Sequence, residues 1–230
     1  MIEYIRYFFR HNEDGLTSLN MTLVRLALVL ALVFAYKGRD RKDFLKILLG
    51  LGLLFQGLLI FWYAGDRDIF LVEGLPFYHC RVAQLMMAVS YFSGKEKWAK
   101  YFAWLGISGA FIAFMIPDPS PYLWPHITNL TYVGSHLILL MTGFMIILNT
   151  NHSLKLGEIF TYSFVLNSFI FLANFIFKAN YGYLSSLPEG LDIDLSKPIL
   201  FILITSLLTL GLSFLEIDLG KIYRKRFARI

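Results

Sequence analysis

The chain has 230 residues and a net charge of +5, with 57% hydrophobic residues and only 16% charged ones. Soluble domains carry about 25% charged residues, so this composition excludes an ordinary soluble domain and favours an integral membrane protein. The positive charge does not indicate nucleic-acid binding, because the basic residues cluster in short connections and at the C-terminus. The single cysteine excludes an internal disulfide and a cysteine-rich metal site.

Residues 1–15 are aromatic and basic, and we expect them to form a short helix in the membrane interface rather than a cleavable signal peptide. Seven apolar stretches follow, each near the roughly 17–25 residues that a membrane span requires. The predicted spans are Thr17–Tyr36, Phe44–Ala64, Pro76–Ser93, Trp98–Ile116, Thr128–Leu148, Gly157–Phe177 and Pro198–Glu216. The sequence therefore predicts an all-α polytopic membrane protein, a single domain over residues 1–230 that forms a seven-transmembrane-helix bundle and ends in a basic tail, residues 217–230.

The distribution of Lys and Arg over the connections predicts the orientation of this bundle. One side would carry the basic residues near 37–42, 95–97 and 155 and those of the tail, whereas few lie on the other side. We therefore expect the N-terminus outside and the C-terminus in the cytoplasm.

In that orientation the polar residues of five spans fall in the outer half of the membrane, whereas the cytoplasmic half is almost purely apolar. Buried polar groups in a membrane usually face the bundle interior or a cavity. Those that converge here are Arg25, Gln56, Cys80, Gln84, Asn129, Tyr132, His136, Asn167 and Asn174. A pore would need polar residues at both depths. The pattern therefore favours a pocket open to the outer side.

Two outer connections fit a lid over this pocket, although their Trp and Tyr residues are also ordinary interface anchors. The first, Pro117–Pro125, is rich in proline and aromatic residues. The second begins with Asn180 and Tyr181 and runs to Pro188.

The stretch Leu75–Gln84 places the only cysteine between His79 and Arg81, one helical turn before Gln84 on the same face. Pro76 would occupy the first turn of this helix. A cysteine thiolate attacks acyl groups well, and a nearby histidine or arginine favours the thiolate. Cys80 is thus a candidate nucleophile, with His136 as its base and Arg25 or Arg81 as the cation that stabilises an oxyanion.

Each of these residues also has a structural interpretation. A lone cysteine in an apolar helix is often a small hydrophobic filler, and His136 could simply bond a neighbouring helix. Arg25 could pair with a lipid phosphate or with backbone carbonyls, and Arg81 could extend outward to the interface. A metal site from His79, Cys80, His136 and His126 matches no standard zinc spacing, so no metal or other cofactor is expected.

At these positions the sequence resembles the YwaF-like family of bacterial seven-helix membrane proteins. The resemblance rests on Leu75–Cys80, on Tyr132–His136 and on Asn180–Leu184 followed by Pro188. That family is similar to a mammalian membrane acyltransferase of ether phosphatidylethanolamines and, more distantly, to androgen-induced hydrolases of fatty acid esters. In those relatives a Cys or Thr nucleophile works with a histidine from a later helix. The resemblance implies that Cys80 and His136 take these roles.

We therefore expect a multi-pass protein of the cell membrane that transfers acyl groups between lipids or hydrolyses acyl esters. Cys80 would form a thioester and His136 would move the proton. The expected substrate-binding residues are Arg25, Gln56, His79, Arg81, Gln84, Asn129, Tyr132, Asn167, Asn174, Asn180 and Tyr181. The alternative is a non-enzymatic lipid or small-molecule transporter or receptor that uses the same pocket. Membrane lipids are the expected partners in either case.

Overall fold

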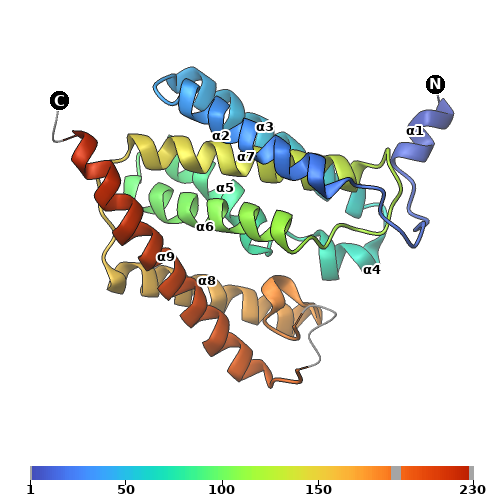
Figure 1. Cartoon of the computed structure of the whole chain (residues 1–230). Coiled ribbons are helices and arrows are strands. Elements are labelled where there is room, and N and C mark those ends of the chain that lie inside the picture. The colour runs from blue at the N-terminus through green and yellow to red at the C-terminus, as the bar shows by residue number, and fades with distance from the viewer. Residues whose placement is uncertain (1, 188–192, 228–230) are drawn as a thin grey trace.

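The computed structural model of the chain describes residues 2–187 and 193–227, with the backbone alone from residue 219, and every element in this part is helical (Figure 1). The helices are α1 (Ile2–Phe8), α2 (Met21–Gly38), α3 (Lys42–Tyr63), α4 (Arg67–Ile69), the π-helical turn η1 (Phe70–Gly74), α5 (His79–Phe92), α6 (Glu96–Met115), α7 (Ile127–Asn149), α8 (Leu156–Phe177), the 3₁₀ turn η2 (Tyr181–Tyr183) and α9 (Lys197–Phe227). The short N-terminal helix is thus present as expected. Helix α9 continues through the predicted tail to Phe227.

Six of these helices, α2, α3, α6, α7, α8 and residues 197–218 of α9, are long and apolar enough to cross a membrane. Helix α5 differs from the predicted span because its 14 residues cover only about 21 Å. Pro76 does not occupy its first turn as predicted, since residues 75–77 form a tight turn in which Phe77 N–H donates to the Leu75 carbonyl (2.9 Å). The extended Tyr78 then precedes the helix. Seven spans remain a prediction.

Side-chain contacts show which connections lie at the same end of the bundle. At one end, Asn149 donates to the Arg39 carbonyl (2.7 Å), and His152 faces the carboxylate of Glu96 (3.2 Å). The connections between α2 and α3, α5 and α6, and α7 and α8 therefore meet there. At the other end, Trp62 at the end of α3 donates to the Phe9 carbonyl (3.2 Å). The segment that contains α5 therefore runs from the end of the bundle where α3 stops to the end where α6 begins. This path agrees with the predicted alternation of the connections.

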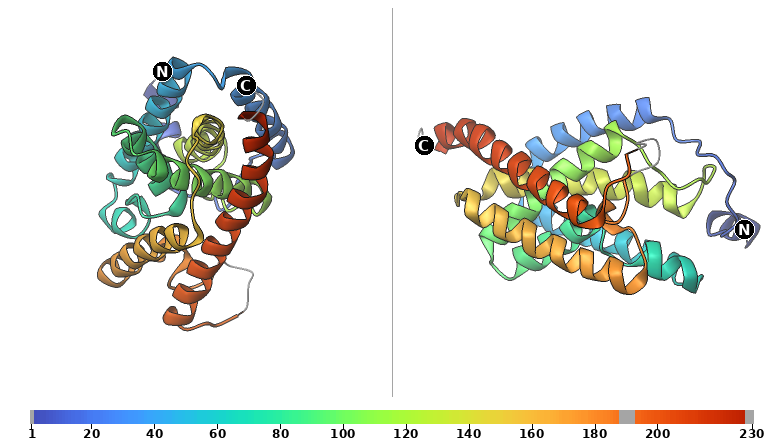
Figure 2. Two further views of the ribbon diagram at one scale, coloured as in Figure 1. Left: turned by 90° about the vertical axis from the view of Figure 1, so that its left-hand side faces the viewer. Right: turned by 90° about the horizontal axis from the view of Figure 1, so that it is seen from below.

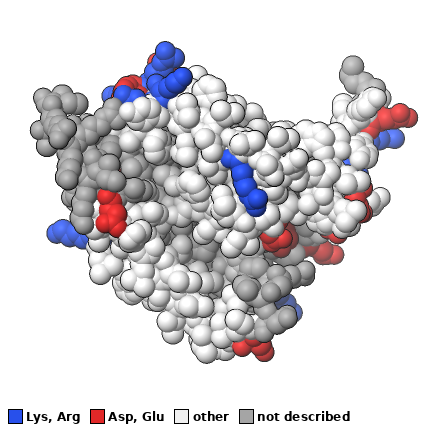
Figure 3. All heavy atoms as spheres, in the orientation of Figure 1, with Lys and Arg blue, Asp and Glu red and all other residues white. Residues whose placement is uncertain are grey.

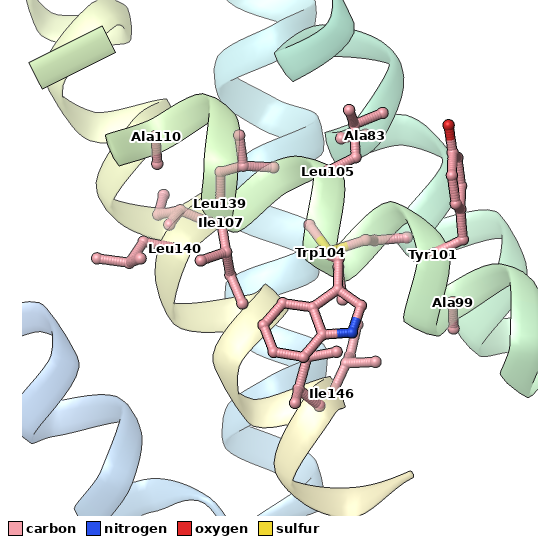
Figure 4. Close-up of a cluster of buried hydrophobic side chains, with 14 of the residues drawn as sticks. Ala83, Ala99, Tyr101, Trp104, Leu105, Ile107, Ala110, Leu139, Leu140 and Ile146 are labelled. Carbon is pink, nitrogen blue, oxygen red and sulfur yellow. The ribbon is translucent and has the colours of Figure 1, made fainter. Parts of the chain in front are cut away.

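Helix α7 lies at the centre and contacts α2, α3, α5 and α6, as Figure 2 shows. Small residues allow these helices to approach closely. A Cβ atom at Gly143 would lie 2.8 Å from the Ala103 carbonyl of α6. The core between α5, α6 and α7 is filled by side chains such as Trp104, Leu105 and Leu139 (Figure 4).

The outer faces of the long helices are apolar and exposed, as a lipid-facing surface requires. On α2 alone the exposed side chains include Leu23, Leu26, Leu30 and Phe34. In Figure 3, charged side chains gather toward the ends of the molecule, and most of the surface between them is uncharged.

Helices α8 and α9 pair with each other on one side of the remaining helices (Figure 1), and a buried ion pair joins α9 to α6. The Lys100 ammonium lies 2.8 Å from one carboxylate oxygen of Glu216, and Trp104 donates to the other (2.8 Å). The ammonium also donates to the His152 carbonyl, and the carboxylate accepts from Leu154 N–H. This pair lies near the connection between α7 and α8, in the half that was predicted to be cytoplasmic and almost purely apolar. That expectation is wrong, because this half contains a charged pair whose hydrogen bonds are satisfied.

Replacing Glu216 by Gln should leave the buried Lys100 ammonium without a counter-ion. Removing one partner of a buried pair costs about 3–5 kcal/mol, so thermal unfolding in detergent should show a loss of stability of that size. The control is Asp43→Asn, because the carboxylate of Asp43 is 93% exposed beside Lys46 and should contribute little. Equal melting temperatures for both variants would contradict a stabilising role of the buried pair.

At the opposite end, His126 attaches the N-terminal segment to the start of α7. Its ring stacks on Tyr122 (centroids 3.8 Å apart) and meets the edge of Trp62. Nδ1 accepts from Thr128 N–H (3.3 Å), so the proton lies on Nε2, which donates to the Arg10 carbonyl (2.9 Å). Burial lowers the pKa of His126 below its ordinary 6.5, although the hydrogen bond to Arg10 opposes this effect.

Acidification should therefore destabilise this end of the protein. The folded state holds His126 neutral, whereas the unfolded chain takes up a proton at a pH near 6.5. Stability is thus fully present above that pH and is lost as the pH falls below it. The melting temperature should fall between pH 7.5 and 5, and His126→Asn should flatten this dependence. An unchanged slope in His126→Asn would show that other groups cause it.

Candidate functional site

The structure places the Cys80 thiol beside the His136 imidazole, where the two groups interact. Cys80 is the second residue of α5, and His136 lies in the first half of α7. The Nδ1 atom of His136 lies 2.7 Å from the Tyr132 carbonyl oxygen, which can only accept, so Nδ1 carries the proton. The other ring nitrogen, Nε2, is therefore free to accept the proton of the thiol.

Neighbouring side chains hold this histidine in place. The Phe114 ring lies 5.7 Å from the imidazole and the Tyr132 ring 5.0 Å from it, both edge-on. The Tyr132 hydroxyl in turn donates to the Ala113 carbonyl of α6. On the other side, a Cβ atom at Gly109 would lie only 3.6 Å from the Cβ atom of Cys80. Helix α6 thus passes close to both residues, and the pair is enclosed by α5, α6 and α7.

Arg81 braces the turn that precedes Cys80. Its guanidinium donates to the Glu73 carbonyl and to that of Leu75 (3.3 Å), and it lies over the Tyr78 ring (5.0 Å). The Tyr78 hydroxyl donates to the Glu73 carboxylate (2.6 Å). Arg81 therefore does not extend freely to the interface. It fixes the backbone from which α5 begins.

His79 connects α5 to α8 and α9. Its Nε2 lies 2.8 Å from Oδ1 of Asn167, and the amide of Asn167 donates to the Thr205 hydroxyl (2.9 Å). Gly182 of η2 lies directly against the ring, since a Cβ atom there would be 2.6 Å from Cε1 of His79. Gly182 also has φ +64°, so glycine satisfies both the backbone and the contact.

The connection after α8 is pinned by Asn174 and Tyr181. The Asn174 side chain donates to the Tyr181 carbonyl (2.9 Å) and accepts from its N–H (2.8 Å). The buried Tyr181 hydroxyl accepts from Leu75 N–H (3.1 Å) and donates to the Leu71 carbonyl (3.0 Å). These two residues, predicted to bind substrate, are engaged in positioning the chain beside Cys80.

The connection after α6 and the connection after α8 meet each other. Tyr183 donates to the carboxylate of Asp118 (3.0 Å) and thereby joins the connection after α8 to the proline-rich one. Asn129 holds the proline-rich connection by donating to the Tyr122 carbonyl (2.8 Å), and Asn180 accepts from Ser186 N–H (3.0 Å) within its own loop. Asp118 and Tyr183 were absent from the predicted site, because sequence spacing does not show that two distant loops touch.

The remaining predicted residues fall into two groups. Arg25 is exposed on α2, and its Nε donates to the backbone carbonyl of Phe114 in α6 (3.0 Å). Gln56 and Gln84 are buried in α3 and α5 and retain polar atoms without a partner among the described residues. A surface groove of about 780 Å³ lies nearby, between η1 and the end of α8, and is lined by Glu73 and Lys178 among others.

The fold and the lipid-facing surface define a polytopic helical membrane protein that encloses a cysteine–histidine pair. The chain belongs to the TMEM164 family, whose family model matches residues 7–216. No curated protein and no solved structure matched the chain. The family match covers all the site residues described above.

Proposed function

We propose that this protein is a membrane-embedded acyltransferase or acyl-ester hydrolase that acts on lipids through Cys80 and His136. The observation that carries the proposal is the thiol–imidazole contact, with Nδ1 of His136 committed to the Tyr132 carbonyl. A nucleophile paired with a base that a third group orients is the arrangement shared by acyl-transfer enzymes. The position of Cys80 at the start of a helix adds to this, since the positive end of the helix dipole favours a thiolate.

In the proposed reaction, Nε2 of His136 takes the proton of the thiol and the sulfur attacks the carbonyl carbon of a lipid ester. The carbon–sulfur bond forms and the ester carbon–oxygen bond breaks. His136 then returns the proton to the departing alkoxide. In the second half, a hydroxyl group of a second lipid, or water, gives its proton to His136 and attacks the thioester. The new carbon–oxygen bond forms, the carbon–sulfur bond breaks, and His136 returns the proton to the Cys80 thiolate. The first acceptor gives acyl transfer and the second gives hydrolysis.

Lipids are the proposed substrates because the site lies within a bundle whose long helices expose apolar surfaces. A two-chain lipid could approach from the membrane while its polar end stays near the outer connections. Arg25, exposed among the apolar side chains of α2, would suit the phosphate of a neighbouring lipid. The orientation of the bundle in the cell membrane is part of this proposal.

Intact-protein mass spectrometry of protein purified from its membrane tests the proposal. An acyl adduct that hydroxylamine removes should be present on the wild type and absent from Cys80→Ala. Turnover of a phospholipid mixture should fall by about 10²–10⁴-fold in His136→Ala, because general-base assistance is lost. His152→Ala, which alters an exposed histidine at the opposite end, is the control and should retain turnover.

A wild-type Cys80 that stays free and unreactive during incubation with mixed phospholipids would refute the enzymatic role. If lipids nevertheless bound, and Cys80→Ala bound them equally well, the protein would instead be a lipid-binding protein or transporter.

A further inference from the structure

Two buried glutamine side chains near Cys80 have unmade hydrogen bonds. Gln84 of α5 is only 3% exposed, and neither its Nε2 nor its Oε1 has a partner among the described residues. Gln56 of α3 is 8% exposed, and its Nε2 is likewise unpartnered. Buried amides almost always find partners, because leaving them unpaired costs free energy. Two such unpaired donors indicate a place for a polar ligand atom.

The Gln84 side chain is directed toward the turn that carries Cys80. It follows Cys80 by four residues, so the two share one face of α5. Side chains of an α-helix lean toward its N-terminus, so the amide of Gln84 covers the preceding turn, where Cys80 lies. Helix α3 makes room for this amide with a glycine: a Cβ atom at Gly52 would lie 2.0 Å from Nε2 of Gln84.

Gln56 lies on the other side of the same space. Gln56 is four residues after Gly52 in α3, one helical turn further toward the end of the bundle where α5 begins. Its side chain also leans toward the N-terminus of its helix, so the Gln56 amide covers the turn of Gly52. The Gln84 amide lies against that same glycine, so the two amides approach each other from α3 and α5.

We infer that the Gln84 amide, assisted by that of Gln56, is the oxyanion-binding group of the site, and that its ligand is the carbonyl oxygen of an acyl ester. This inference rests on the proposed function. When the Cys80 sulfur attacks the carbonyl carbon, the electrons of the carbon–oxygen double bond move onto the oxygen. The N–H groups of Gln84 and Gln56 donate to that oxygen until the double bond re-forms and the alkoxide departs. Neutral amides stabilise this charge without competing with His136 for the proton.

The test compares two reactions of Cys80 in Gln84→Met, which keeps the length of the side chain but removes the donor. Acylation by para-nitrophenyl butanoate develops an oxyanion, and the burst of nitrophenol measures its rate. Alkylation by iodoacetamide develops none. We expect acylation to fall by about 10²–10³-fold while alkylation changes by less than about twofold. Ser90→Ala is the matched control: this buried, unpartnered hydroxyl of α5 lies far along the helix and should leave both rates unchanged.

Other outcomes overturn the inference in distinct ways. Equal acylation rates in wild type and Gln84→Met would show that the amide is not the donor, while the proposed function would stand. An equal loss of acylation and alkylation would show that the substitution changes the reactivity of the thiol or the folding of the protein, and not the binding of an oxyanion. A wild type that iodoacetamide alkylates but no ester acylates would refute the proposed function together with the inference. Should Gln84→Met fail to fold, Gln56→Met is expected to show the same selective loss of acylation, of at least about tenfold.

Discussion

The hydrogen bond from His136 Nδ1 to the Tyr132 carbonyl is the interaction on which the site depends. That carbonyl is one turn earlier in the same helix, so the imidazole is oriented by its own backbone and needs no acidic residue. An acidic third group would require a buried carboxylate within the membrane, which is costly to desolvate. A backbone carbonyl fixes the tautomer without an added charge. The same bond directs Nε2 to the cysteine, so a change in the path of α7 would alter the only base that contacts the thiol among the described residues.

The residues around this pair form a supporting layer more than a binding surface. Arg81, Asn174 and Tyr181 hold the turn between η1 and α5, and the His79–Asn167–Thr205 chain holds α8 and α9 against α5. These polar groups are costly in a membrane unless they are satisfied, and here they satisfy one another. The consequence is that Cys80, although close to a helix end, is held by contacts from both sides. Rigid support of this kind is what a reaction that requires a fixed attack geometry needs.

The sequence predicted the helical class and the apolar helices, because the length of an apolar stretch depends on local composition alone. It also paired Cys80 with His136. It placed Pro76 inside a helix, because proline suits a first turn, but the Tyr181 hydroxyl bonds the backbone at Leu75 and stabilises a turn there instead. Bonds between distant segments, such as Tyr183 with Asp118 or Lys100 with Glu216, leave no periodic signal. Arg25, Asn174 and Asn180 were expected to face a substrate, and the structure adds a hydrogen bond from each to the backbone.

Gln56 and Gln84 are buried residues of α3 and α5 whose amide donors stay unused among the described residues. Evolution toward stability alone would favour an apolar residue at such a position, because a methionine fills the same volume without an unpaired donor. Gly52 of α3 leaves the room that the Gln84 amide occupies, because any larger residue at this position would displace the amide. Two buried amide donors that stay unused on the helices around the cysteine are a feature of a site prepared for charge that appears only during the reaction.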